Sequence, residues 1–306
     1  MLVFSTSDKG GTGRSVTSAN VAYRAALQGN NVCYVDFDFG SPTAGAVFSI
    51  DHLLHGTESN GVHSYLQGRA AEPVRQAVWG ASGRDVLRTR PDRAGELVLM
   101  PGDHSGGEFP GNQGVVDACM KLFLALEQEF DVSFIDLSAG RSHATEVAMA
   151  ATASDTIRRR VKTRWLVFHR WTRQHVIAAD SLVRGERGLL QTGVAHGHDE
   201  RALEQCIKFV RTAVADPNSK EMAGLAPTQV SWLRQCDSDL HRLAKEYRVG
   251  RINLLDTVPL DPVLQWREQL LTDVDVHNRK IANHKTVDAF DRLAKSITDD
   301  EAWPRM

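Results

Sequence analysis

A glycine-rich stretch near the start of the chain, residues 7–15, constrains the fold more than any other feature. It reads SDKGGTGRS and lies between an apolar run at 2–4 and a helical pattern at 16–27. A glycine-rich loop between a strand and a helix lets consecutive backbone N–H groups point inward, and the N-terminus of the helix adds partial positive charge. The stretch therefore predicts a cradle for anionic phosphate groups.

Acidic residues follow two further predicted strands. The apolar run 31–36 ends at Asp36, with Asp38 two residues later, and the run 131–136 ends at Asp136. Because ligands bind beyond the carboxyl ends of parallel strands, we expect these carboxylates beside the phosphate loop, placed for metal and water. Taken singly, Asp36 could be a turn cap and Asp136 a helix or loop cap. The loop and the acids, in this order and context, favour a nucleotide-binding site.

These segments resemble the ParA/MinD ATPases. The loop from Lys9 matches their deviant Walker A motif, K-G-G-x-G-K-S/T; residues 36–41 resemble their D-x-D segment, and the strand ending at Asp136 looks like a Walker B strand. The resemblance extends more faintly to Pro259, which follows a strand. Arg14 stands where the family has its second lysine, which suggests a variant, actinobacterial-like subgroup whose P-loop ends Gly-Arg-Ser.

The resemblance implies ATP or ADP with magnesium as cofactors. Phosphate donors and other nucleotide contacts would come from Gly10, Gly11, Thr12, Gly13, Arg14, Ser15 and Pro259, the last beside the base. Ser15 would coordinate magnesium directly, while Asp36 and Asp136 would hold it through waters.

The resemblance also implies three catalytic residues. Asp38 would position the attacking water, and Lys9 would reach the partner's nucleotide across a homodimer interface, although a solvated loop lysine is the alternative. At Arg14 the charge is kept but a planar fork replaces a compact ammonium. Two outcomes are open: Arg14 binds the β/γ-oxygens and permits slow turnover, or it swings out and leaves a binding-only switch.

Strands and helices alternate along the chain, which predicts a doubly wound, mostly parallel sheet with helices on both faces. We expect one three-layer α/β/α P-loop NTPase domain over residues 1–306, with a less regular, mostly helical insertion around 188–250. The individual expectations that matter below are a loop at 188–202 and helices at 72–79, 202–215, 230–247 and 263–271.

A basic segment at 157–187 suggests an anionic partner. It carries nine lysine or arginine residues against two acids, a net charge of +7, and Trp165 and Trp171 lie among the arginines. A solvated face is one interpretation. The other is a contact, over residues 158–187, with an acidic protein surface or nonspecific DNA.

The bulk composition sets the remaining expectations. The formal net charge is −2, four cysteines are scattered without metal-ligand spacing, and no long apolar run occurs. The chain ends in an acidic stretch broken by proline, unlike the basic membrane helix of MinD-type proteins. We therefore expect a cytoplasmic protein without a membrane anchor.

The leading hypothesis is an ATP-dependent molecular switch that binds nucleotide and magnesium, dimerises around them and signals to a partner, with slow hydrolysis. A second hypothesis is a nucleotide-bound scaffold that has lost turnover through Arg14. A third is a ligase or kinase of the same fold that acts on a small substrate, for which no substrate pocket or base can be identified.

Overall fold

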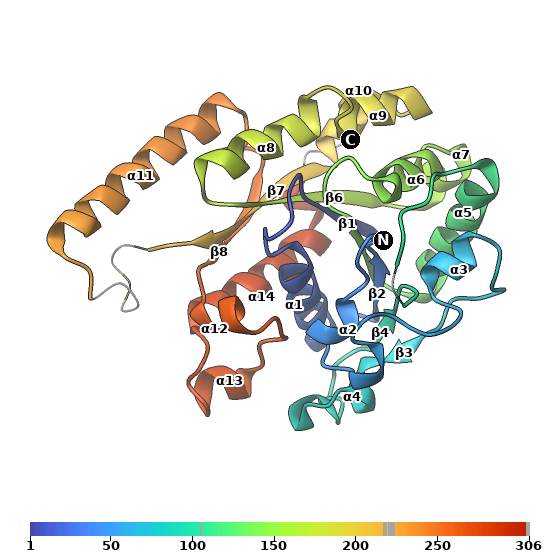
Figure 1. Ribbon diagram of the computed structural model, residues 1–306, viewed down its shortest axis with the longest axis horizontal. Helices are drawn as coiled ribbons and strands as arrows, with labels where there is room; N and C mark the ends of the chain where they lie inside the picture. The colour runs from blue at the N-terminus through green and yellow to red at the C-terminus, as the bar shows by residue number, and fades with distance from the viewer. Residues whose placement is uncertain (105, 217–218, 220–223, 304–306) are drawn as a thin grey trace.

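The computed structural model describes residues 1–104, 106–216, 219 and 224–303, and it contains one sheet flanked by two layers of helices (Figure 1). The strands lie in the order β3-β4-β2-β5-β1-β6-β7-β8, and all pairs are parallel except β3 with β4. The strands are β1 (Leu2–Thr6), β2 (Val32–Phe37), β3 (Gln76–Ala77), β4 (Leu97–Met100), β5 (Val132–Leu137), β6 (Thr163–Arg170), β7 (Ile207–Val214) and β8 (Leu254–Pro259).

Each face of the sheet has its own hydrophobic core because side chains alternate along every strand. In β1, Leu2 and Phe4 point to one core and Val3 to the other. Phe4 stacks on Trp165 of β6 with ring centroids 4.3 Å apart. The doubly wound α/β fold expected from the sequence is confirmed.

The helices divide between the two faces. The first core is covered mainly by α3 (Val62–Leu66), α5 (Gln113–Glu129), α6 (His143–Thr152), α7 (Asp155–Arg160), α8 (Arg173–Arg184), α9 (Leu189–His196) and α10 (Glu200–Gln205). The second is covered by α1 (Arg14–Leu27), α2 (Ala44–Val47), α4 (Val78–Ala81) and α14 (His284–Thr298). The remaining elements are α11 (Pro227–Glu246), α12 (Pro262–Trp266), α13 (Asp273–His277) and three short 3₁₀ turns, η1 (Asp51–Leu53), η2 (Asp85–Leu87) and η4 (Asp300–Ala302).

The helix predicted at 202–215 is wrong, because most of this segment is β7, which pairs with β6 and β8. Ile207 and Phe209 enter the first core, whereas Val210 enters the second. Two cations within the strand obscure this alternation in the sequence. Lys208 is nearly buried and donates to the carbonyl of Ile252 at 2.8 Å, and Arg211 is buried as well.

Three shorter predictions also need correction. The expected loop at 188–202 contains α9 and the start of α10, and the expected helix at 72–79 is replaced by β3 and the start of α4. The helix expected at 263–271 ends with Trp266. Each of these elements is only a few residues long, so contacts with the rest of the fold decided its conformation more than the local sequence pattern did. The helix expected at 230–247 is confirmed as the longer α11, which projects from one end of the molecule (Figure 1).

Within the described ranges, none of the helices combines the length and the apolar character needed to cross a membrane.

The first helix is fastened to a distant segment by one buried amide. Asn20 of α1 has no exposed surface; its Nδ2 donates to the carbonyl of Gln269 at 2.9 Å, and its Oδ1 accepts from the N–H of Leu271 at 2.7 Å. These bonds satisfy two backbone groups that no strand or helix pairs. They also hold the helix whose N-terminus follows the phosphate loop.

Asn20→Ala should lower the free energy of unfolding by about 2 to 4 kcal/mol, because it leaves the buried carbonyl of Gln269 and N–H of Leu271 without partners. Urea unfolding followed by circular dichroism measures the change. As a control, Asn278→Ala at an exposed position should change it by less than about 0.5 kcal/mol. Equal losses in the two variants would contradict this account.

Candidate functional site

The phosphate loop leaves β1 and leads directly into α1. Gly11 and Gly13 have φ angles of +71° and +75°, a conformation that favours glycine. A Cβ added to Gly10 or Gly11 would have no atom within 4 Å, so the loop is open on that side. Gly13 directly precedes α1, and no side chain among the described residues caps the N–H groups of the first turn of this helix. These are the properties that a polyphosphate cradle requires.

Two residues that sequence reasoning missed anchor this loop. The hydroxyl of Thr212 on β7 donates to the carbonyl of Thr12 at 2.6 Å. Arg141 pairs with Asp8 at 2.9 Å and also donates to the carbonyl and hydroxyl of Ser181 on α8. Arg141 follows the strand that carries Asp136, and this position after a strand end could have identified it as a site residue. The sequence around Thr212 contains no comparable pattern.

Arg14 is buried and turned toward the acidic strand ends. Its Nε donates to Oδ1 of Asp136 at 2.7 Å, and its Nη2 donates to Oδ2 of Asp38 at 3.0 Å and to the Ser15 hydroxyl at 3.3 Å. Burial alone would lower the pKa of Arg14, but the negative charges of Asp136 and Asp38 outweigh it and raise the pKa above its ordinary value. The guanidinium is therefore a permanent cation, bonded to two carboxylates.

Tyr34 completes the surroundings of Asp136. Its hydroxyl donates to Oδ2 of Asp136 at 2.8 Å from one strand away, and it is fully buried. Burial, followed by the negative charge of Asp136, raises the pKa of this phenol, so it remains a donor. The sequence analysis did not identify Tyr34, although it lies two residues before Asp36 and so on the same face of β2.

Asp36 lies in the same edge of the sheet but is engaged differently. Its Oδ2 accepts from the N–H of Ala44 at 3.0 Å, and its Oδ1 from the N–H of Asp38 at 3.3 Å. Burial raises the pKa of Asp36 to about 8, and the charges of Asp136 and Asp38 contribute to the rise. The turn-capping alternative is therefore the role that the contacts of this carboxylate support.

As folded, these residues do not fit magnesium. Ser15, Asp38 and Asp136 all accept hydrogen bonds from the Arg14 guanidinium. Among the described residues, no group of three or more His, Cys, Asp or Glu side chains is arranged to hold a metal ion. Magnesium demands a near-octahedral set of oxygens. The expected ligands Ser15, Asp36 and Asp136 are thus near one another, but a side-chain cation or backbone N–H groups already use the oxygens.

Lys9 lies at the loop entrance and is partly exposed. Burial and the nearby charges of Arg170 and Lys9 lower the pKa of His175, so this lysine lies beside the start of α8. Within the described part of the chain its ammonium forms no ion pair. Its proposed contact across a dimer interface stays a prediction.

Pro259 ends β8, three strands from β1 along the carboxyl edge. With Val214, Thr257 and Leu260 it lines a mainly apolar hollow of about 210 Å³. The role of Pro259 beside the base stays a prediction.

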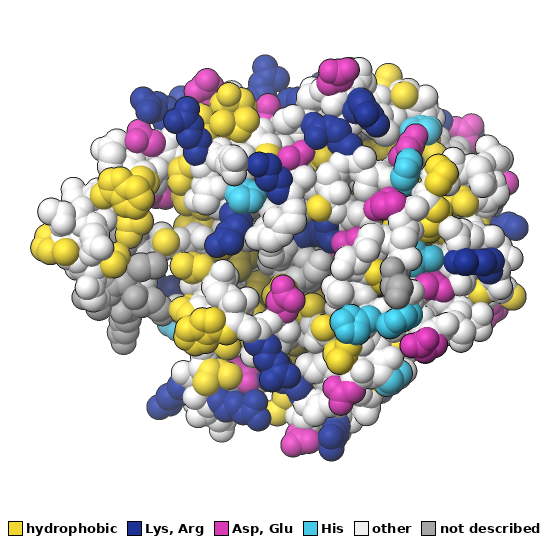
Figure 2. All heavy atoms as spheres, in the orientation of Figure 1, with side chains coloured by type: hydrophobic (Ala, Val, Ile, Leu, Met, Phe, Trp, Pro, Cys, Tyr) yellow, Lys and Arg dark blue, Asp and Glu magenta, His cyan; other side chains and the backbone are white. Residues whose placement is uncertain are grey.

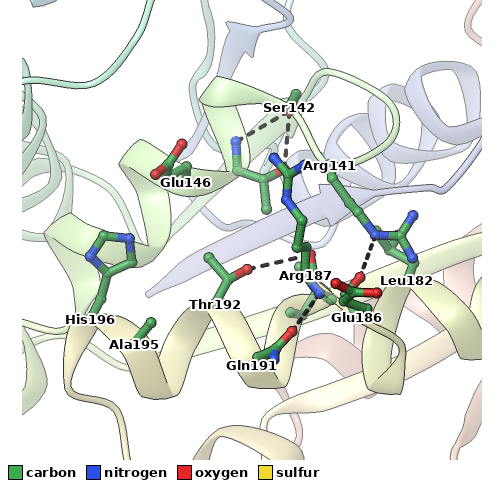
Figure 3. A pocket seen from close by; sticks show the side chains of 13 residues that line it. Arg141, Ser142, Glu146, Leu182, Glu186, Arg187, Gln191, Thr192, Ala195 and His196 are labelled. Carbon is green, nitrogen blue, oxygen red and sulfur yellow. Dashed lines mark hydrogen bonds between the residues drawn. The ribbon is translucent and has the colours of Figure 1, made fainter.

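A larger hollow lies on the other side of Arg141 (Figure 3). It has a volume of about 380 Å³ between α6, α8 and α9, and Glu146, Arg187 and Thr192 are among its lining residues. Within it, the backbone N–H of Arg187 donates to Oε1 of Gln191, and the hydroxyl of Thr192 donates to the backbone carbonyl of Arg187. It is separate from the carboxylates around Arg14.

The basic segment does not form one continuous cationic patch. Lys162 and Arg164 pair with Asp300, Arg158 with Asp155, and Arg184 with Asp180. Figure 2 shows lysine and arginine side chains interspersed with acidic ones on the face in view. The tryptophans are not available for stacking on bases, because Trp165 is in the core and Arg211 covers the ring of Trp171 at 3.4 Å. The members without an ion pair among the described residues are Arg159, Arg160, Arg170, Arg173 and Arg187.

Comparison with known proteins identifies one family. The family described as the CobQ/CobB/MinD/ParA nucleotide binding domain matches residues 3–271. No curated protein matches the sequence significantly.

Solved structures share the fold across nearly the whole chain. A chain of the MinC:MinD cell division protein complex from Aquifex aeolicus has a TM-score of 0.55 and 15% identity, covering 97% of this chain and 95% of its own. MinD with Mg-ADP from Pyrococcus horikoshii has a TM-score of 0.53 and 16% identity, with coverage of 99% and 98%. A plasmid partition protein from Borrelia burgdorferi bound to AMPPNP has a TM-score of 0.56 and 13% identity, with coverage of 96% and 96%.

Arg14→Met should lower the free energy of unfolding by about 3 to 5 kcal/mol, because it leaves the buried carboxylate of Asp136 and the partly exposed carboxylate of Asp38 without their cation. Chemical denaturation near neutral pH measures the loss. Arg201→Met, at an exposed arginine of α10, is the matched control and should cost less than about 0.5 kcal/mol. A loss at Arg14 no larger than that at Arg201 would show that the network contributes nothing to folding.

Proposed function

The chain belongs to the CobQ/CobB/MinD/ParA nucleotide-binding family, and from that premise we propose that it is an ATP-dependent molecular switch. In this proposal the whole chain is one P-loop NTPase domain that binds ATP or ADP, dimerises around it and signals to a partner. The supporting observation is the convergence of an open phosphate loop with Arg14, Asp38 and Asp136 at one edge of the sheet.

The proposed binding step uses this chain's own donors. Phosphate oxygens would accept from backbone N–H groups of the loop around Gly11 and Gly13 and from the uncapped first turn of α1. The base would lie toward the hollow beside Pro259. Thr212 and Arg141 hold the loop on both sides, so it is already ordered for binding.

Hydrolysis is proposed to be slow. Asp38 is the acid expected to position the attacking water, but it forms an ion pair with Arg14 at 3.0 Å. A carboxylate held by a guanidinium is a weaker acceptor for water. This contact supports the alternative of a non-hydrolysing nucleotide-bound scaffold, and single-turnover measurements separate the two. Among the residues that the structure describes, no contact supports the ligase or kinase alternative.

The proposed partner is a protein with an acidic surface, or nonspecific DNA, in the cytoplasm. The charge for either would come from the arginines that form no ion pair among the described residues, which are Arg159, Arg160, Arg170, Arg173 and Arg187. Burial of Trp165 removes base stacking from the DNA alternative, which leaves phosphate contacts alone. Loss of DNA binding with rising salt would be the mark of such contacts.

Dimerisation should depend on nucleotide and on Lys9. In a buffer that contains magnesium, size-exclusion chromatography with light scattering should give a dimer for the wild type with ATP and a monomer without nucleotide, whereas Lys9→Ala should stay monomeric. Lys121→Ala, at an exposed lysine of α5, should behave like the wild type. A wild type that remains monomeric with ATP would refute the dimeric switch.

Arg14→Lys should raise the rate of single-turnover ATP hydrolysis by about one to two decades, which corresponds to about 1.5 to 3 kcal/mol for one charge-assisted contact regained. The shorter ammonium frees Asp38 to act on water. Adding Asp38→Ala to this variant should remove the gain. A lower rate in a variant with unchanged thermal stability would count against the role given to Arg14.

A further inference from the structure

The side chain of Arg14 points away from its own helix and toward the acidic strand ends. Arg14 is the first residue of α1, yet its side chain does not extend along the helix but reaches back to the ends of β2 and β5. Only 7% of its surface is exposed. Its guanidinium thus lies beneath the phosphate loop, among the acids of two neighbouring strands.

The atoms that Arg14 contacts share a chemistry. They are the Ser15 hydroxyl, which follows the phosphate loop, and carboxylate oxygens of Asp38 and Asp136, at 3.3, 3.0 and 2.7 Å. Hydroxyl and carboxylate oxygens grouped beside a phosphate loop are hard ligands suited to a divalent cation. Here one planar cation, carried by the chain itself, is bonded to all three.

This cation offsets part of the negative charge around it. Asp136 is buried and its second oxygen is held by Tyr34. A divalent ion at the same oxygens would come within a few ångströms of the guanidinium, and like charges repel strongly at such distances in a buried site. The guanidinium and the metal therefore exclude one another.

We propose that Arg14 takes the place of magnesium in this chain, so that it binds a nucleoside diphosphate or triphosphate without a divalent cation. The inference rests on the proposed function, since it presupposes nucleotide binding at residues 7–15. Within the described residues Nη1 of Arg14 makes no hydrogen bond, and this nitrogen is the donor available to a phosphate oxygen. The chain then carries both the phosphate contact and the charge that a metal would supply.

Isothermal titration of the full chain with ADP and with a non-hydrolysable ATP analogue tests the proposal, once with magnesium and once with EDTA. The dissociation constant of the wild type should change by less than about threefold between the two conditions, which is below about 0.7 kcal/mol. Weakening by tenfold or more in EDTA would overturn the inference while leaving the proposed function intact. Absence of binding in both conditions would overturn both.

Arg14→Lys provides the second arm. A lysine lacks the planar fork that bonds several oxygens at once, so the oxygens of Ser15, Asp38 and Asp136 become available to a metal ion. Nucleotide binding by this variant should therefore be at least about tenfold weaker in EDTA than in magnesium. Arg201→Lys should retain the metal independence of the wild type. Equal metal dependence in the wild type and in Arg14→Lys would refute the proposal that Arg14 replaces magnesium. If the variant folds poorly, the wild-type measurement alone still tests the proposal.

Discussion

One buried ion-pair network holds the edge of the sheet together. The carboxylates of Asp38 and Asp136 meet there because their strands are neighbours, and both are bonded to the guanidinium of Arg14. Asp136 is buried and Asp38 is partly exposed, so the two negative charges repel one another where little water screens them, and the guanidinium offsets that repulsion. Asp36 lies at the same edge but does not contact the guanidinium. Burial, together with the charges of Asp136 and Asp38, raises its pKa, as expected for an acid that lacks a cationic partner.

The strand order makes this network possible. β1 lies between β5 and β6, and β2 lies beyond β5, so the phosphate loop and the acidic strand ends emerge side by side. All of these strands are parallel, and their carboxyl ends therefore share one edge. Asn20 then fixes α1 against the segment at 269–271, which sets the position from which Arg14 reaches back.

The loop is also joined to elements outside this edge. Thr212 binds its middle from β7, and Arg141 joins Asp8 to α8. Movement of the loop on nucleotide binding must therefore strain or break contacts with β7 and α8. The cation bonded to the acidic strand ends is part of the polypeptide, since it is the guanidinium of Arg14.

The sequence by itself determined the phosphate loop, the acids at strand ends and the doubly wound fold, because each depends on residues adjacent in the chain and on local periodicity. It did not reveal β7, since Lys208 and Arg211 interrupt its apolar alternation and only pairing with β6 and β8 makes the strand stable. Nor did it reveal the partners of Arg14. That side chain could have met phosphate or solvent, and only the tertiary structure, which brings Asp136 to it across 122 residues, decided that it binds carboxylates. The physical reason is that burial makes an unpaired carboxylate costly, so the nearest cation is drawn to it.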